Sequence, residues 1–158
     1  MLEHALKYRE AGYSVIPIKP DFNPETQKFE KKPYTNWKAY QRILPTEDDI
    51  RSWWAKWPDA MIGVITGEVT KLYGIDCDSE DALQTVQNML PDSFITPMLT
   101  TPRGGRHFWV KCCNGTRLRS ANGVLPNVDT KGEGGYLVAP PSRNEHGQTY
   151  QWIEGLSF

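Results

Sequence analysis

The chain opens with hydrophobic residues at helical spacing and then changes to extended spacing. Leu2, Ala5 and Leu6 lie on one face of a predicted helix, and Gly12 is a typical helix stop. Residues 13–19 contain closely spaced β-branched side chains, which favour a strand. The beginning of the chain therefore predicts a helix that leads directly into a strand.

Residues 20–36 are polar and contain three prolines, so we expect a loop there. After this loop, Thr46 followed by Asp49 is the signature of a capping box at the start of a second helix. Apolar residues recur along this helix at i, i+3, i+4 and i+7, and Pro58 ends it. The apolar stripe, which core packing explains most simply, consists of Ile50, Trp53, Trp54 and Trp57.

The middle of the chain predicts two strands, at residues 61–65 and 72–75, that are separated by a short turn. Ser79 is a typical N-cap for a third helix, and acidic residues follow it in the first turn. The buried face of this helix would consist of Leu83, Val86 and Leu90.

The rest of the chain shows short extended segments that glycine and proline interrupt. Strands are predicted at residues 98–101, 107–111, 124–128, 136–139 and 150–153. Early helices and later strands predict an α+β fold, in which a mainly antiparallel sheet is flanked by helices. The length of 158 residues suits a single domain spanning residues 1–158.

Composition narrows the class of protein only slightly. The formal net charge of −1 argues against binding nucleic acid through bulk basicity, although a cluster of cation-binding carboxylates would also lower the net charge. Three cysteines without a CxxC pair indicate neither a disulfide framework nor a zinc site. We therefore expect a cytoplasmic protein with no membrane segment.

A pair of acids, Asp76 and Asp78, follows the second of the middle strands. Residues two apart in a strand point to the same face, so both carboxylates can reach one cation. Hard divalent cations prefer such oxygen ligands. Solvated turn residues that merely precede a helix are the alternative interpretation. Cys77 would face the other way and be buried rather than reactive.

The turn at Gly104-Gly105 is surrounded by three potential cations, Arg103, Arg106 and His107. Glycine permits backbone conformations and close approaches that side chains forbid. Cations around such a turn would make charge-assisted hydrogen bonds to nucleotide phosphates. An ordinary hairpin with exposed arginines explains the same segment.

A lone acid, Asp129, follows an apolar stretch and precedes a glycine-rich turn. It could complete a carboxylate triad, and Lys131 would lie on the same side if the strand continues. The segment is weak evidence alone, because glycine-rich turns are common.

The order of these motifs is more specific than any one of them. Asp-x-Asp, Gly-Gly-x-His, and a single Asp before a glycine-rich turn and Pro-Pro-Ser together resemble the archaeo-eukaryotic primase superfamily. More narrowly, the chain resembles the N-terminal bifunctional DNA primase/polymerase domain of replication proteins from plasmids, phages and prophages. The resemblance extends over nearly the whole chain.

This resemblance implies an RRM-like catalytic core that transfers nucleotides under the direction of a template, by a two-metal-ion mechanism. It assigns Asp76, Asp78 and Asp129 to two Mg²⁺ or Mn²⁺ ions, and His107 to the phosphates of an incoming NTP or dNTP. Further candidate nucleotide-binding residues are Arg103, Arg106, Lys131 and Ser142.

The implied partners are a DNA template and primer, and a helicase that is either a C-terminal domain of a longer replication protein or a separate protein. Candidate residues for contacting the DNA backbone are Lys32, Arg117 and Arg119, although charged solvated loops explain them equally well. Lys31 is ambiguous in the same way.

Two other functions stay open at this point. A degenerate relative could bind nucleotide or single-stranded DNA without polymerising. A metal-dependent nuclease also uses clustered carboxylates, but the order of the histidine and glycine motifs favours a polymerase.

Overall fold

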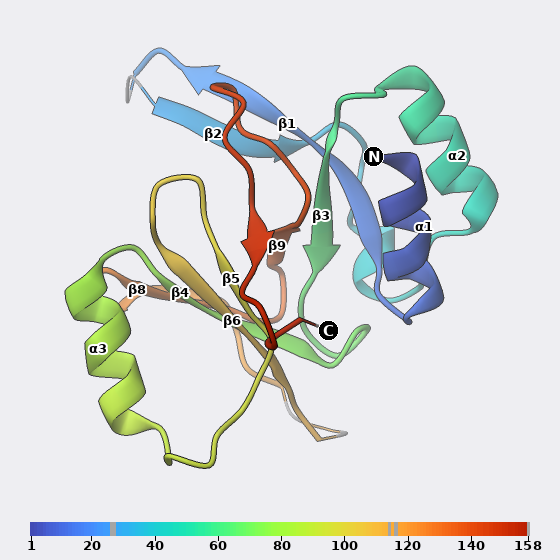
Figure 1. Cartoon of the computed structure of the whole chain (residues 1–158). Coiled ribbons are helices and arrows are strands. Elements are labelled where there is room, and N and C mark those ends of the chain that lie inside the picture. Colours follow the sequence, from blue (N-terminus) through green and yellow to red (C-terminus); the bar gives the residue numbers. More distant parts are fainter. Residues whose placement is uncertain (26–27, 114, 116, 158) are drawn as a thin grey trace.

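The computed structural model describes residues 1–25, 28–113, 115 and 117–157 of the chain (Figure 1). Its helices are α1 (Leu2–Glu10), α2 (Glu47–Lys56), α3 (Glu80–Met89) and the short 3₁₀ helix η1 (Ala39–Gln41). Its strands are β1 (Val15–Asn23), β2 (Lys28–Pro33), β3 (Met61–Ile65), β4 (Leu72–Cys77), β5 (Met98–Thr100), β6 (Arg106–Lys111), β7 (Ala121–Leu125), β8 (Val128–Lys131), β9 (Tyr136–Ala139) and β10 (Gln151–Trp152).

The strands form two sheets, and every strand pair within them is antiparallel. The smaller sheet has the order β2-β1-β3-β9, and the larger has the order β10-β5-β6-β4-β8-β7. The α+β class and the mainly antiparallel pairing are confirmed. The division into two sheets goes beyond the single sheet expected from the sequence, because hydrophobic patterning identifies strands but not their partners.

Helices α1 and α2 lie beside the smaller sheet, whereas α3 lies beside the larger one (Figure 1). The predicted helix caps are present: the Thr46 side chain accepts from the Asp49 backbone N–H in a complete capping box, and the Ser79 side chain accepts from that of Ala82. None of the helices in the described part of the chain is long and apolar enough to cross a membrane.

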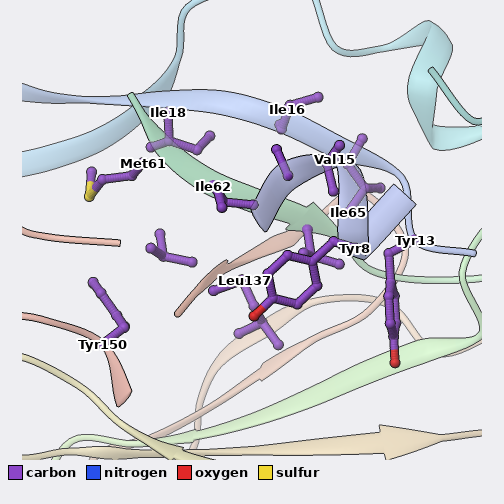
Figure 2. Close-up of a cluster of buried hydrophobic side chains, with 14 of the residues drawn as sticks. Tyr8, Tyr13, Val15, Ile16, Ile18, Met61, Ile62, Ile65, Leu137 and Tyr150 are labelled. Atoms are coloured by element: carbon purple, nitrogen blue, oxygen red, sulfur yellow. The ribbon is translucent and has the colours of Figure 1, made fainter. Parts of the chain in front are cut away.

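The main core joins α1, α2 and the smaller sheet to one face of the larger sheet. Figure 2 shows part of it, with side chains from α1, β1, β3 and β9. Ile50 and Trp54 are buried in it, and Trp53 and Trp57 pack at its edge, so the apolar stripe of α2 serves the core as predicted. A second cluster, in which α3 covers the opposite face of the larger sheet, includes Cys77, Leu83, Val86, Phe108 and Val128. The larger sheet is therefore covered on both faces, and its two faces have different partners.

Two sequence predictions were wrong. Residues 20–36 are not a loop, because β1 continues to Asn23 and pairs with β2. Pro20 is tolerated there because β1 has passed the end of β3, so that no third strand needs its missing N–H. Residues 124–128 are not one strand, because Pro126 and Asn127, which has a φ of 57°, form the turn between β7 and β8.

Candidate active site

Strand β4 brings the predicted acids and histidine together. Asp76 on β4 is the register partner of His107 on β6 and of Asp129 on β8, so the three residues lie side by side across the larger sheet. Cys77 points to the opposite face, where it is buried under α3 as predicted. On the Asp76 side, a Cβ at Gly74 would lie 2.5 Å from Leu137 of β9, so this face looks toward the smaller sheet.

Asp76 is the most enclosed acid of the group, with 19% of its side chain exposed. Its Oδ1 lies 3.1 Å from Nε2 of His107. Within the described chain, neither this oxygen nor Nδ1 of His107 has a partner in hydrogen-bonding geometry. Burial raises the pKa of Asp76, but the adjacent His107, followed by Lys31 and Lys131, outweighs it and holds the pKa below its ordinary value. Asp76 is therefore an anion whose buried Oδ1 lies against His107 without a hydrogen-bond partner among the described residues.

Asp78 lies one residue beyond β4, where its backbone N–H donates to the carbonyl of Asn127 at 2.9 Å. Desolvation raises its pKa, and the Asp76 and Asp129 carboxylates raise it further. Three anions near one another repel, and a bound cation relieves such repulsion.

The third acid, Asp129, already has polar partners on both oxygens. Its Oδ1 accepts the backbone N–H of Gly123 at 2.8 Å, and its Oδ2 accepts Nζ of Lys131 at 3.0 Å. The ammonium of Lys131 also donates to Oδ1 of Asn122 at 3.3 Å. Lys131 thus lies on the same side of β8 as Asp129, as the strand alternation predicted.

These carboxylates fit a divalent cation in chemistry but are not yet arranged as a complete ligand set. Among the described residues, no group of three or more His, Cys, Asp and Glu side chains is placed to hold one metal ion. The hard oxygen donors, the unsatisfied Oδ1 of Asp76 and the repulsion acting on Asp78 all favour a cation. Asp129 would have to exchange Lys131 for that cation.

Asp76 and His107 line two cavities. The first, of about 100 Å³, is also lined by Asp78, Arg103 and Lys31. The second, of about 350 Å³, is also lined by Lys31, Lys131, Ser120, Gly134 and Tyr136. Cationic side chains therefore line both cavities beside the acids, an arrangement suited to a phosphorylated ligand.

The Gly104-Gly105 turn serves the site in two ways. Gly104 has a φ of 88°, which glycine adopts without strain. Gly105 permits close approach, because a Cβ there would lie 2.6 Å from the backbone oxygen of Cys77, between the two acids. Arg103 lines the smaller cavity, whereas Arg106 donates to the carbonyls of Gly104 and Gly105 at 2.7 and 3.2 Å. Of the two arginines, Arg103 is the one positioned for a ligand.

Other predicted residues lie away from these cavities. Ser142 is fully buried, and its Oγ accepts the backbone N–H of Ile62 at 2.8 Å, a contact that supports the fold. Arg117 and Arg119 are exposed and, with Arg42, line a separate open groove of about 920 Å³. Lys32 is exposed and pairs with Glu30 at 3.1 Å.

Lys31, rather than Lys32, faces the acids. Its ammonium lies 5.4 Å from the centre of the Tyr150 ring, and its backbone oxygen accepts the Tyr136 hydroxyl at 2.6 Å. Neither tyrosine was a candidate from the sequence. Had residues 28–33 been recognised as a strand, the alternation of side chains would have shown that only one of the two lysines can face the site.

Comparison with known proteins identifies the family of the chain. A family model described as "Bifunctional DNA primase/polymerase, N-terminal" matches residues 5–157 of the chain. A search of curated proteins found no match.

Proposed function

Because this chain belongs to the bifunctional DNA primase/polymerase family, we propose that it catalyses template-directed nucleotidyl transfer onto a primer 3′-hydroxyl at the Asp76 site. The family implies nucleotide and DNA substrates. The resemblance to replication proteins of plasmids, phages and prophages supports a role in replicating a mobile element, with a helicase as the expected partner. Residues 1–158 would act as one catalytic domain.

One observation carries this proposal. Asp76 is flanked on its two neighbouring strands by His107 and Asp129, and Asp78 follows at the end of the same strand. Three acids and a histidine therefore lie near one another, beside cavities lined by Lys31. Phosphoryl transfer depends mainly on positioning and on electrostatic stabilisation, which such a site can supply.

The three acids would hold divalent cations, Mg²⁺ or Mn²⁺. When bound, such ions lower the pKa of the attacking hydroxyl and neutralise the charge that develops on the triphosphate. Asp129 would join the ligand set by releasing Lys131, whose ammonium then becomes available to a phosphate oxygen. His107 would donate an imidazole N–H to the phosphates, and Arg103 would contact them from the smaller cavity.

Primer extension tests the proposal. Wild type would be incubated with a primer–template, dNTPs and Mn²⁺, beside Asp76→Asn and the control Asp92→Asn, which changes an exposed acid after α3. We expect Asp76→Asn to lower extension by more than about 100-fold, because even residues that only support metal ligands cost 10–100-fold. EDTA should abolish extension by the wild type and the control.

The outcomes separate the alternative functions. Extension that Asp76→Asn leaves unchanged would refute the assignment of Asp76. A folded wild type that binds dNTP but never extends a primer would be a binding module. Shortening of the labelled DNA without dNTPs would indicate a nuclease.

A further inference from the structure

A second groove adjoins the smaller cavity of the candidate active site. This groove, which we call the aromatic groove, has a volume of about 830 Å³ and is lined by Tyr34, Lys56, Trp57, Arg143, Asn144 and Glu145, among others. Met61, Asn144 and Glu145 line both the groove and the cavity that contains Asp76 and His107. The cavity measures only about 100 Å³, so a ligand strand that reaches the acids must extend beyond it.

The distinctive feature of the aromatic groove is a pair of stacked rings at the surface. Tyr34 and Trp57 lie with their ring centres 4.6 Å apart and their planes within 13° of parallel. Tyr34 is 36% exposed, so the stack is not closed off by the core. Exposed aromatic rings in a groove are what proteins use to stack the bases of single-stranded nucleic acid, because every base has a π-face.

The same groove carries cations suited to phosphates. Nζ of Lys56 lies 4.6 Å from the centre of the Trp57 ring, and the exposed Arg143 lies on the same wall as Asn144. Asp59 and Glu145 also line the groove and partly offset these charges, so stacking must supply much of the binding energy. A strand held in this way would bind in a salt-dependent manner through a small number of phosphate contacts.

The wall between the groove and the cavity is well braced. Oδ1 of Asn144 accepts the backbone N–H groups of His146 and Gln148 at 3.0 and 2.9 Å, and the backbone N–H of Asn144 donates to the carbonyl of Gln148 at 2.9 Å. These bonds fix the turn that carries Arg143 and Glu145. The hydrogen bonds of this turn therefore fix the position of the groove relative to Asp76.

We propose that the aromatic groove binds single-stranded DNA next to the reacting centre, with a base extending the Tyr34–Trp57 stack and with Lys56 and Arg143 contacting phosphates. This inference rests on the proposed polymerase function, since it names the surface that receives the DNA strand. It assigns a ligand to side chains that lie outside the acid and histidine motifs.

Fluorescence anisotropy with a labelled oligo(dT) of about 12 nucleotides, without dNTP, tests the proposal. Tyr34→Ala should weaken binding about 5- to 140-fold, the factor that corresponds to a stacking energy of ~1–3 kcal/mol per base. Tyr34→Phe should retain wild-type affinity, since the ring is kept. The matched control is Phe94→Ala, because Phe94 is 37% exposed and follows α3 on the other side of the larger sheet. Arg143→Ala should reduce the slope of log K against log salt by about one.

Three results would overturn the inference. The first is a wild type that fails to bind oligo(dT), and the second is a Tyr34→Ala variant that binds oligo(dT) with wild-type affinity. The third is a Tyr34→Ala variant that loses affinity for dTTP but retains its affinity for oligo(dT). The last result would assign the stack to the incoming nucleotide instead. The proposed function is judged separately by primer extension, so a protein that binds oligo(dT) through Tyr34 but never extends a primer would refute only the catalytic proposal.

Discussion

Replacing Gly105 with alanine should damage catalysis more than it damages the fold. A Cβ at this position would lie 2.6 Å from the backbone oxygen of Cys77, 3.1 Å from Oγ1 of Thr101 and 3.5 Å from Cα of Asp78. Ordinary Cβ contacts begin at 3.4 Å, so the backbone between the two acids must move by about 0.8 Å. Because the clash is with backbone, no side-chain rotation can relieve it.

The magnitude follows from this displacement. Overpacking of this kind costs ~1–3 kcal/mol, which corresponds to a fall in Tm of roughly 2–12 °C for a domain of this size. A misplacement near 1 Å at a catalytic centre can cost about 100-fold in rate. We therefore expect Gly105→Ala to stay folded and to extend primers roughly 10- to 100-fold more slowly than wild type.

Gly104→Ala provides the matched control. Gly104 has a φ of 88°, and a Cβ at this position would meet nothing within 4 Å, so alanine there suffers conformational strain without a clash. The left-handed conformation costs ~1–2 kcal/mol, which makes the loss of stability comparable. Thermal unfolding and primer extension of both variants separate the two effects. Equal losses of activity in the two variants would refute the effect of the clash. A Gly105→Ala variant with the wild-type Tm and the wild-type rate of primer extension would refute it as well.

Three further predictions follow from other parts of the molecule. Thr46→Ala should lower Tm by about 2–4 °C in a thermal unfolding experiment, because it removes a helix cap worth ~1 kcal/mol; an unchanged Tm would contradict the cap. Cys113 should react with Ellman's reagent in the native state while Cys77 does not. Cys77 is fully buried, and burial raises the pKa of its thiol to about 11. Equal reaction rates of the two thiols would contradict the burial of Cys77. Lys131→Ala should tighten Mn²⁺ binding about fivefold in an electron paramagnetic resonance titration without nucleotide. The reason is that Lys131 competes with the cation for Asp129 through an ion pair worth ~1 kcal/mol. Weaker Mn²⁺ binding by the variant would show that Lys131 supports the site instead.

The sequence predicted local structure correctly where the signal depends only on neighbouring residues in the chain. The capping box at Thr46, the cap at Ser79 and the buried side of α3 all appear as expected, because caps and helical periodicity depend on residues within one or two turns. The strand at residues 136–139 was placed correctly for a similar reason. The failure at residues 20–36 involves Pro20, whose tolerance in a strand depends on which strand lies alongside. The failure at residues 124–128 involves Pro126, which lies in the turn between two strands and not within one.

The sequence by itself determined the α+β class and the family resemblance, because motif order and alternation are properties of the chain. It also predicted the acids and the histidine as site residues. Only the tertiary structure decided that Asp76 lies between His107 and Asp129, that Lys31 rather than Lys32 faces them, and that Ser142 serves the fold. Strand pairing joins residues far apart in the chain, and a one-residue change of register would turn each side chain to the opposite face. Which charges meet at the site is therefore a property of the assembled sheets.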